Sequence, residues 1–460
     1  MNRINIACIN LINSSVSIDS GSGTKRSSML RPWLRPTLTV IALALLIAIV
    51  GCGGQGAGGQ RRDGTKPAGE LTFRVFDPPA ETAGLKAAVD AYNAANPARR
   101  IKLETVPVAD ALAQYTREVN GGGGPDISQL ASTWVPDLAA ARLLAPLNEL
   151  ADDDPPGAGT DDFLALDLAR QGDGLYGLPW SADTFALVFD PAVLAEARVS
   201  PPTTWEELTA AAKALTGQHR TGFCFAASSG PTSEVWHLFN YYLWSHDAQL
   251  IKKVGDGFAP GAEPGQLAAA IGYLNEFFVT GNASKAMISV ENAGDPAVNA
   301  AVAQGRCGFA FMNPTQFRTA LGSNPGLRSA PMPLGRDGTP TTHLGGRSLG
   351  INPNTSDQEA AWAFIKFIST REFFSQYYSG QFPAQRSLLA QGEFSQEYDG
   401  FVQAMPTART YGLYAGSPTP IPKYWSTTAQ TLGAVFSGQL DPSRAGAEFH
   451  DQLKEFGDGV

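Results

Sequence analysis

The chain of 460 residues is long enough for two domains of ordinary size, and its apolar content of 43% supports sizeable cores. Five of its 34 Lys and Arg residues and one of its 43 Asp and Glu residues precede Cys52, so the chain from Cys52 onward carries a formal net charge of −13. Because a nucleic-acid-binding surface needs basic side chains to meet phosphates, this acidic body argues against nucleic acid as a partner.

An apolar run over residues 37–50 follows basic residues and ends at a small residue, which is the layout of a secretory signal. The run is too short to favour a spanning helix. Its last residues belong to Ile49-Val50-Gly51-Cys52, which resembles the bacterial lipobox. We therefore expect residues 1–51 to be a signal peptide, with Met29 as an alternative start. Cys52 would begin the mature chain and carry acyl chains such as palmitate, enough for stable anchoring. The alternatives are an ordinary cleavage site beside an incidental Cys and a short membrane anchor that is left uncut.

The chain after Cys52 begins with a Gly-rich stretch and then shows alternating element patterns. Residues 52–70 have almost no apolar side chains and are expected to form a flexible tether. Residues 71–76 alternate as a strand, residues 82–93 show helical spacing, and residues 101–106 form a second strand. This order predicts a βαβ unit with a right-handed crossover, and hence a mixed or parallel sheet.

Two later helices carry capping-box signals at their starts. Thr204 is followed by Glu207, and Ser356 is followed by Glu359, so each pair can exchange hydrogen bonds with the first helical turn. Between these helices, residues 335–342 are polar and contain Gly and Pro. They are expected to link two lobes or to form a hairpin turn.

Four Cys residues are present, of which Cys8 lies in the leader and Cys52 is the expected lipid site. Cys224 and Cys307 remain as an even pair in an exported body, where the compartment is oxidising. They form either a disulfide or two separate buried thiols, since the sequence does not give the distance between them.

Motifs for catalysis or cofactor binding are weak. Residues 346–350 match G-x-S-x-G, but a nucleophile elbow needs a helix directly after the Ser, and the residues after Ser348 are expected to form a strand. Residues 121–124 lack the Lys-Ser/Thr of a phosphate loop, and no His pair has metal-ligand spacing. We predict that the chain is not an enzyme and binds no cofactor or metal, with a hydrolase using Ser348 as a remote alternative.

Aromatic residues gather near expected loop and strand ends. Rigid aromatic faces beside polar groups suit sugar rings, which have apolar C–H faces and hydroxyls that need partners. Core packing is the alternative for each of them, and Trp205 and Trp362 are assigned to the core. The candidates are Trp134, Tyr176, Trp180, Trp236, Trp244, Tyr414, Tyr424 and Trp425.

Seven short motifs occur in one order across residues 71–456: Gly124-Pro125-Asp126-Ile127, Tyr176-Gly177-Leu178-Pro179, Pro201-Pro202-Thr203-Thr204-Trp205-Glu206-Glu207-Leu208, Gln304-Gly305-Arg306, Pro331-Met332-Pro333-Leu334-Gly335, Leu344-Gly345-Gly346 and Ala360-Ala361-Trp362-Ala363-Phe364. Together they resemble the extracellular solute-binding lipoproteins of ABC importers, the family that includes maltose- and trehalose-binding proteins (family 1). The resemblance implies an α/β fold of the two-lobe periplasmic-binding-protein type (type II), with the ligand cleft between lobes joined by a hinge.

The resemblance also implies boundaries and site positions. Lobe I is expected over residues 71–182 plus 336–382, and lobe II over residues 183–335 plus 383–460, with crossings near 181–186, 335–341 and 380–384. A carboxylate at the position of Asp183 commonly holds sugar hydroxyls in such proteins. The expected ligand-binding residues are Asp77, Thr133, Trp134, Trp180, Asp183, Glu234, Trp236, Asn313, Gly346, Arg347, Arg386 and Tyr424.

Two departures from the family pattern bear on the ligand. Many carbohydrate binders have Trp where this chain has Arg347, and Trp-Pro where it has Asn313-Pro314. A guanidinium can grip phosphate or carboxylate groups, which raises an anionic polyol such as a glycerophosphodiester or sugar phosphate as an alternative to a neutral sugar.

The expected function is a monomeric receptor, lipid-anchored on the extracytoplasmic side of the cell membrane. It would capture a sugar or sugar-like solute by lobe closure and deliver it to the permease subunits of an ABC transporter. A lipoprotein that kept the fold for a structural or signalling role is a further alternative.

Overall fold

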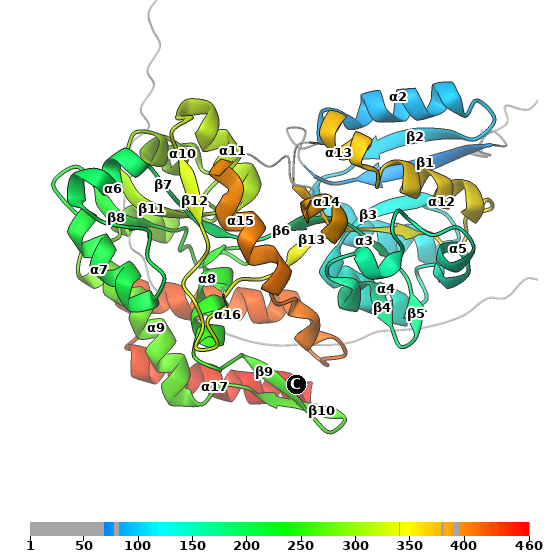
Figure 1. The fold of residues 1–460 in the computed structure, drawn as a ribbon. Coiled ribbons are helices and arrows are strands. Elements are labelled where there is room, and N and C mark those ends of the chain that lie inside the picture. Colours follow the sequence, from blue (N-terminus) through cyan, green and yellow to red (C-terminus); the bar gives the residue numbers. More distant parts are fainter. Residues whose placement is uncertain (1–68, 78–81, 340, 379–380, 391–395, 460) are drawn as a thin grey trace, which may run out of the picture. The chain divides into compact units, whose positions relative to one another are not determined.

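The computed structural model describes residues 69–459 except 78–81, 340, 379–380 and 391–395 (Figure 1). The predicted signal peptide, the alternative start at Met29 and the lipidation site at Cys52 lie outside the described residues. Within the part of the chain that is described, no helix is both long and apolar enough to cross a membrane.

The first of two large sheets, that of lobe I, has six strands in the order β14-β6-β13-β3-β1-β2. Its strands are β1 (Glu70–Val75), β2 (Arg100–Thr105), β3 (Ile127–Ala131), β6 (Leu178–Asp183), β13 (Gly345–Ile351) and β14 (Phe382–Pro383). β1 pairs in parallel with β2 and β3, so the predicted βαβ unit is confirmed. β13 runs antiparallel to β3 and β6, and the carboxyl ends of β1, β3 and β6 therefore meet the start of β13 at one edge.

Helices cover both faces of this sheet, as expected for a sheet buried on both sides (Figure 1). α2 (Leu85–Ala95) and α12 (Gln358–Phe367) pack on one face, where they share a core with Ile127 of β3. α3 (Val108–Asn120) and α4 (Val135–Ala140) pack with Leu130 on the other. The remaining helices of this lobe are α5 (Asn148–Asp153), α13 (Arg371–Gln376) and α14 (Arg386–Ala390), and its short hairpin is β4 (Arg170–Gln171) with β5 (Gly174–Leu175).

Lobe II has a four-stranded sheet in the order β12-β7-β11-β8 and a separate hairpin of β9 and β10. The strands are β7 (Ala186–Phe189), β8 (Thr221–Cys224), β9 (Ile251–Val254), β10 (Gly257–Pro260), β11 (Cys307–Met312) and β12 (Arg328–Ala330). The helices are α6 (Pro191–Ala197), α7 (Trp205–Leu215), α8 (Val235–Ser245), α9 (Pro264–Val279), α10 (Pro296–Ala303), α11 (Pro314–Ser323), α15 (Asp399–Ala404), α16 (Ile421–Phe436) and α17 (Pro442–Asp458). Both expected α/β lobes are therefore present.

The two sheets shift the lobe boundaries expected from sequence. Asp183 is the last residue of β6 and belongs to lobe I. The chain before β13 lies against lobe II, where the Leu344 amide donates to Arg409 O. Pro383 pairs with Ser181 in the sheet of lobe I, and Ser387 of α14 still bonds Asp162 there. We therefore propose crossings at residues 184–185, at 331–344, and after α14.

One of the two capping boxes predicted from the sequence is present, and the other is not. Thr204 and Glu207 form the predicted capping box at the start of α7, with Glu207 N donating to Thr204 Oγ1 at 3.1 Å. The box predicted at Ser356 is wrong. Asp357 lies directly before α12 and accepts from Ala360 N at 2.9 Å, so the cap sits one residue later.

Cys224 and Cys307 are joined by a disulfide, which settles the choice between a bridge and separate thiols. Cys224 ends β8 and Cys307 begins β11, and the two strands pair in parallel. The bridge closes a sequence separation of 83 residues, so it restricts the unfolded chain strongly.

Removing this bridge should destabilise lobe II. We expect Cys224→Ser with Cys307→Ser to lower the free energy of unfolding by about 2–5 kcal/mol. Urea denaturation of the wild type with and without dithiothreitol measures the effect, and the double variant is the control that reductant should not change. Identical midpoints for the reduced and oxidised wild type would contradict the bridge's role.

Candidate functional site

Polar side chains from distant parts of the chain meet at the carboxyl-terminal edge of the sheet of lobe I. Asp77 follows β1, Asp183 ends β6, and Arg347 is the third residue of β13. Pairing fixes their proximity, because Gly345 lies opposite Asp183 and Arg347 lies opposite Ser181. Ligands of open α/β sheets bind outside the carboxyl ends of the strands. With three neutral partners they form what we call the sheet-edge cluster: Asp77, Gln129, Asp183, Arg347, Tyr378 and Gln381.

An ion pair between Asp77 and Arg347 is the centre of the sheet-edge cluster. Arg347 Nε lies 2.7 Å from Asp77 Oδ1, and the Asp77 side chain is fully buried. Asp77 Oδ2 also accepts from Gln129 Nε2 at 2.5 Å and from the Tyr378 hydroxyl at 3.1 Å. Three donors thus satisfy this carboxylate. The Arg347 guanidinium also lies 5.1 Å from the centre of the Phe76 ring, a cation–π contact.

Asp183 is the carboxylate of the cluster that keeps acceptor capacity. Gln381 Nε2 donates to Asp183 Oδ2 at 3.2 Å, while Gln381 Oε1 accepts from the Ser181 hydroxyl at 2.7 Å. Burial raises the pKa of Asp183 to about 6; nearby Arg347 lowers it and Asp77 raises it further. The side chain is still 17% exposed, so a solute can reach it. Asp183 is therefore ionised at neutral pH and open to a donor.

Two glycines make this arrangement possible. A Cβ on Gly345 would lie 2.4 Å from Asp183 Oδ1. Gly346 has φ +133°, and a Cβ there would lie 1.9 Å from Ser181 O. A side chain at position 346 would therefore push β13 away from the backbone of β6, whereas one at position 345 would displace the side chains of Asp183 and His343. The role of Gly346 is thus close strand pairing beside the site.

A buried histidine network borders the cluster on the side of lobe II. The Tyr241 hydroxyl lies 2.5 Å from His343 Nδ1, and the His343 ring stacks on His237 at a centroid distance of 4.3 Å. Burial lowers the pKa of His343 to about 3, so its ring is neutral at pH 7. His343 Nε2 lies 3.8 Å from Asp183 Oδ1. The network therefore does not neutralise Asp183.

Two predicted residues of lobe II have structural partners. Glu234 accepts from Ala293 N at 2.7 Å and from the Gln316 amide, and burial raises its pKa to about 7. Asn313 caps α11, accepting from Gln316 N at 3.0 Å. The contacts of Glu234 join the start of α8 to the start of α11 and to the backbone at Ala293.

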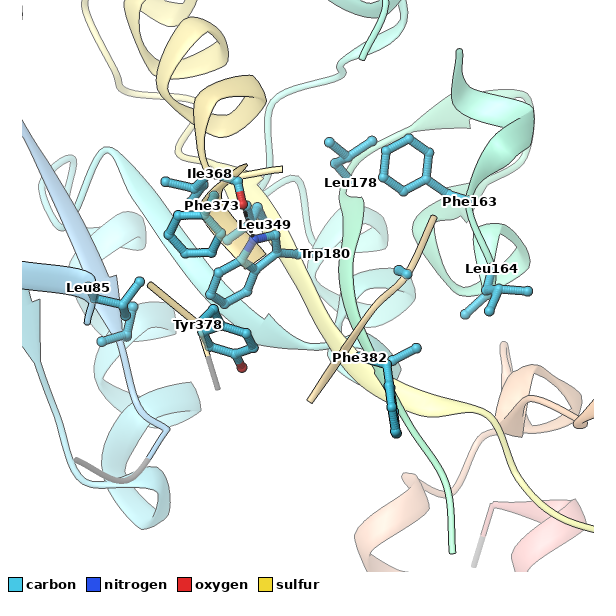
Figure 2. Close-up of a cluster of buried hydrophobic side chains, with 14 of the residues drawn as sticks. Leu85, Phe163, Leu164, Leu178, Trp180, Leu349, Ile368, Phe373, Tyr378 and Phe382 are labelled. Carbon is cyan, nitrogen blue, oxygen red and sulfur yellow. Dashed lines mark hydrogen bonds between the residues drawn. The ribbon is translucent and has the colours of Figure 1, made fainter. Parts of the chain in front are cut away.

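The three predicted aromatic ligands Trp180, Trp236 and Tyr424 are at most 1% exposed, so we assign them to the cores. Figure 2 shows Trp180 among Phe373, Tyr378 and neighbouring apolar side chains, with its indole N–H donating to Ile368 O at 2.7 Å. Sequence reasoning erred here because a core Trp and a ligand Trp look alike beside a strand end. Trp205 and Trp362 are buried as predicted.

The other predicted residues lie around the cluster without joining it. Trp134 packs against Phe76 with ring centroids 5.1 Å apart. Thr133 lines a cavity of ≈ 20 Å³ shared with Asp137 and, from lobe II, Tyr411 and Tyr414. Arg386 is exposed at the start of α14, and no hydrogen bond or ion pair between described residues links it to the cluster.

Sequence reasoning missed Gln129, Tyr378, Gln381 and His343. Gln381 lies in the crossing expected near residues 380–384, and His343 lies two residues before the Gly345-Gly346 pair, so proximity to these features was the available signal. Ser348 lies inside β13 with its side chain buried, and its hydroxyl donates to Ser132 Oγ at 3.2 Å. No cluster of potential metal ligands occurs among the described residues.

The Asp77–Arg347 pair should be a stabilising interaction stronger than a surface pair. We expect Asp77→Asn to destabilise the protein by about 2 kcal/mol, because it removes the charge of the carboxylate that the guanidinium contacts. A double-mutant cycle with Arg347→Gln, followed by urea denaturation, measures the coupling. The exposed Lys86–Asp90 pair is the matched control. A coupling no larger than that of the control pair would contradict this assignment.

Comparison with known proteins identifies the family of this chain. A family model described as bacterial extracellular solute-binding protein matches residues 77–372. A Brucella abortus protein named only as a binding protein is 26% identical over 391 residues, which cover 82% of this chain and 90% of that protein.

Two solved structures share the fold at low sequence identity. The GacH receptor of Streptomyces glaucescens, solved unliganded and with acarbose, has a TM-score of 0.69 and 22% identity, covering 85% of this chain and 99% of that chain. UgpB from Mycobacterium tuberculosis, solved with glycerophosphocholine, has a TM-score of 0.70 and 18% identity, with the same coverage. The chain therefore belongs to the bacterial extracellular solute-binding protein family and has its two-lobe fold.

Proposed function

We propose that this protein is the lipid-anchored receptor of an ABC importer and that it captures a hydroxyl-rich, sugar-like solute between its lobes. The observation that carries the ligand class is Asp183, an ionised, partly exposed carboxylate with spare acceptor capacity at the carboxyl edge of the sheet. A carboxylate in this setting accepts hydrogen bonds from neighbouring hydroxyls, and such charge-assisted bonds are strong. The acarbose-bound receptor with the same fold supports a sugar-like ligand.

The charges of the site disfavour the anionic alternative. Arg347 is the guanidinium that raised this alternative, but its Nε already pairs with Asp77 at 2.7 Å. Asp183 adds a second carboxylate, so the three charged groups sum to a negative charge. A phosphate placed here would meet repulsion from Asp183. The glycerophosphocholine complex of UgpB keeps such a ligand worth testing.

Lobe closure is the proposed capture step. Asp183 ends β6 immediately before the first crossing, and Thr184 and Thr342 on the first two crossings contact each other through their hydroxyls. A few residues at such crossings absorb the change in dihedral angles when two domains close. The Gly-rich tether after Cys52 would leave the body free to collect solute and meet its permease.

Removing the Asp183 side chain should abolish tight binding of neutral sugars. We expect Asp183→Ala to weaken binding by about 10- to 100-fold, because hydrogen bonds to a charged group are lost. Isothermal titration calorimetry with a panel of mono- and oligosaccharides gives the affinities. Asp173→Ala, in the exposed β4–β5 turn, makes the same charge change as a control. Unaltered affinity in Asp183→Ala would remove this residue from the site.

The wild-type protein should bind neutral ligands more tightly than anionic ones. We expect glucose or maltose to bind more tightly than glucose 6-phosphate, since Asp183 repels phosphate oxygens. Competition titrations at low and high salt measure this preference, because salt weakens such repulsion at an exposed site. Tighter binding of glucose 6-phosphate would revive the anionic alternative.

The lipid anchor is tested independently of the ligand. Cys52→Ser in the full-length chain should shift the protein from the membrane fraction to the medium or periplasm, because the acyl chains that anchor it are absent. Metabolic labelling with an alkyne fatty acid checks modification directly. Retention of label in Cys52→Ser would show that another residue is modified.

A further inference from the structure

We propose that the solute carries a protonated amine on its hydroxyl-bearing ring and that Asp183 binds this ammonium group. This inference rests on the proposed function and names the ligand chemistry more closely. It begins from charge balance. Asp77 and Asp183 both lie near Arg347, whose Nε bonds Asp77 and not Asp183. One guanidinium thus serves two carboxylates, and the surplus negative charge sits on the more exposed one.

The groups facing Asp183 do not supply the missing charge. Gln381 donates from a neutral amide at 3.2 Å. His343 Nε2 lies 3.8 Å from Oδ1, beyond hydrogen-bond distance, and burial keeps the ring neutral. Tyr241, behind His343, stays protonated because burial raises its pKa. Among the described residues, Arg347 is therefore the only cation that lowers the pKa of Asp183, and it also interacts with Asp77.

Asp183 has free acceptor positions and lacks a balancing positive charge of its own. An ionised carboxylate offers about four acceptor positions, and the amide of Gln381 fills one. Burial that raises the pKa to about 6 shows that the site leaves the charged form understabilised. A ligand ammonium answers both needs, since it brings three N–H donors and the balancing charge. A metal ion fits poorly, because the described residues offer no cluster of ligands for one.

An amine should bind more tightly here than a hydroxyl in the same position. A hydrogen bond to a charged partner gains more when the donor is also charged, and the site is only partly open to water. We expect an advantage of about tenfold for an amino sugar over its neutral parent. An N-acetylated sugar has a substituent at the same position without the charge, and it should lose the advantage.

The test uses the mature chain and three matched probes: glucose, glucosamine and N-acetylglucosamine. Calorimetric titration at pH 7 should give glucosamine about tenfold tighter than the other two. Asp183→Asn, which keeps size and polarity, should make glucosamine and glucose equal within about threefold. Asp173→Asn makes the same change in net charge in an exposed turn and should keep the wild-type ratio.

A second measurement needs no variant. Protons compete with the ammonium for Asp183 below pH 6, so the glucosamine-to-glucose affinity ratio of the wild type should fall between pH 7 and pH 5. A glucosamine-to-glucose affinity ratio near one at pH 7 would overturn the inference, and so would a ratio that neither Asp183→Asn nor acid changes. In either case, binding of glucose would still support the proposed function. Failure of all three probes, and of galactose and mannose with their amines, overturns the sugar function and this inference with it.

Discussion

The site depends on one buried ion pair. Asp77 and Arg347 are 270 positions apart in sequence, yet their 2.7 Å contact ties the loop after β1 to the start of β13. Burying the Asp77 carboxylate is costly unless its oxygens are satisfied, and Gln129 and Tyr378 complete that requirement. Tyr378 also belongs to the apolar cluster around Trp180 (Figure 2), so the pair connects the site to the core of lobe I.

Asp183 remains able to accept hydrogen bonds from a solute because Arg347 forms its ion pair with Asp77. If the guanidinium formed its ion pair with Asp183 instead, the charge of Asp183 would be balanced within the protein and would not be available to a solute. The close approach of β13 to β6 at Gly345 and Gly346 fixes where each carboxylate lies. Gly345 thus leaves room for the Asp183 carboxylate beside β13, and Gly346 lets β13 approach the backbone of Ser181.

Sequence patterns predicted the parts of the fold that depend on local periodicity. The βαβ unit, the capping box at Thr204 and the order of elements could be predicted, because apolar spacing and helix caps depend on residues that are close together in the sequence. The lobe boundaries depend on more than local patterns, since a crossing is defined by which sheet a strand joins. Pro383 lies within the crossing expected near residues 380–384, and its pairing with Ser181 appears only in three dimensions.

The site was predicted in part for the same reason. Asp77, Asp183 and Arg347 follow strand ends or a Gly pair, and such positions lie at a sheet edge. Gln129 and Tyr378 had no such marker, and Trp180 and Tyr424 carried a marker that core residues share. A structure of the mature protein with its bound solute tests the central claim most directly. We expect a donor atom of the solute within about 3.2 Å of an Asp183 carboxylate oxygen. A solute bound between the lobes with Asp183 facing only water would contradict it.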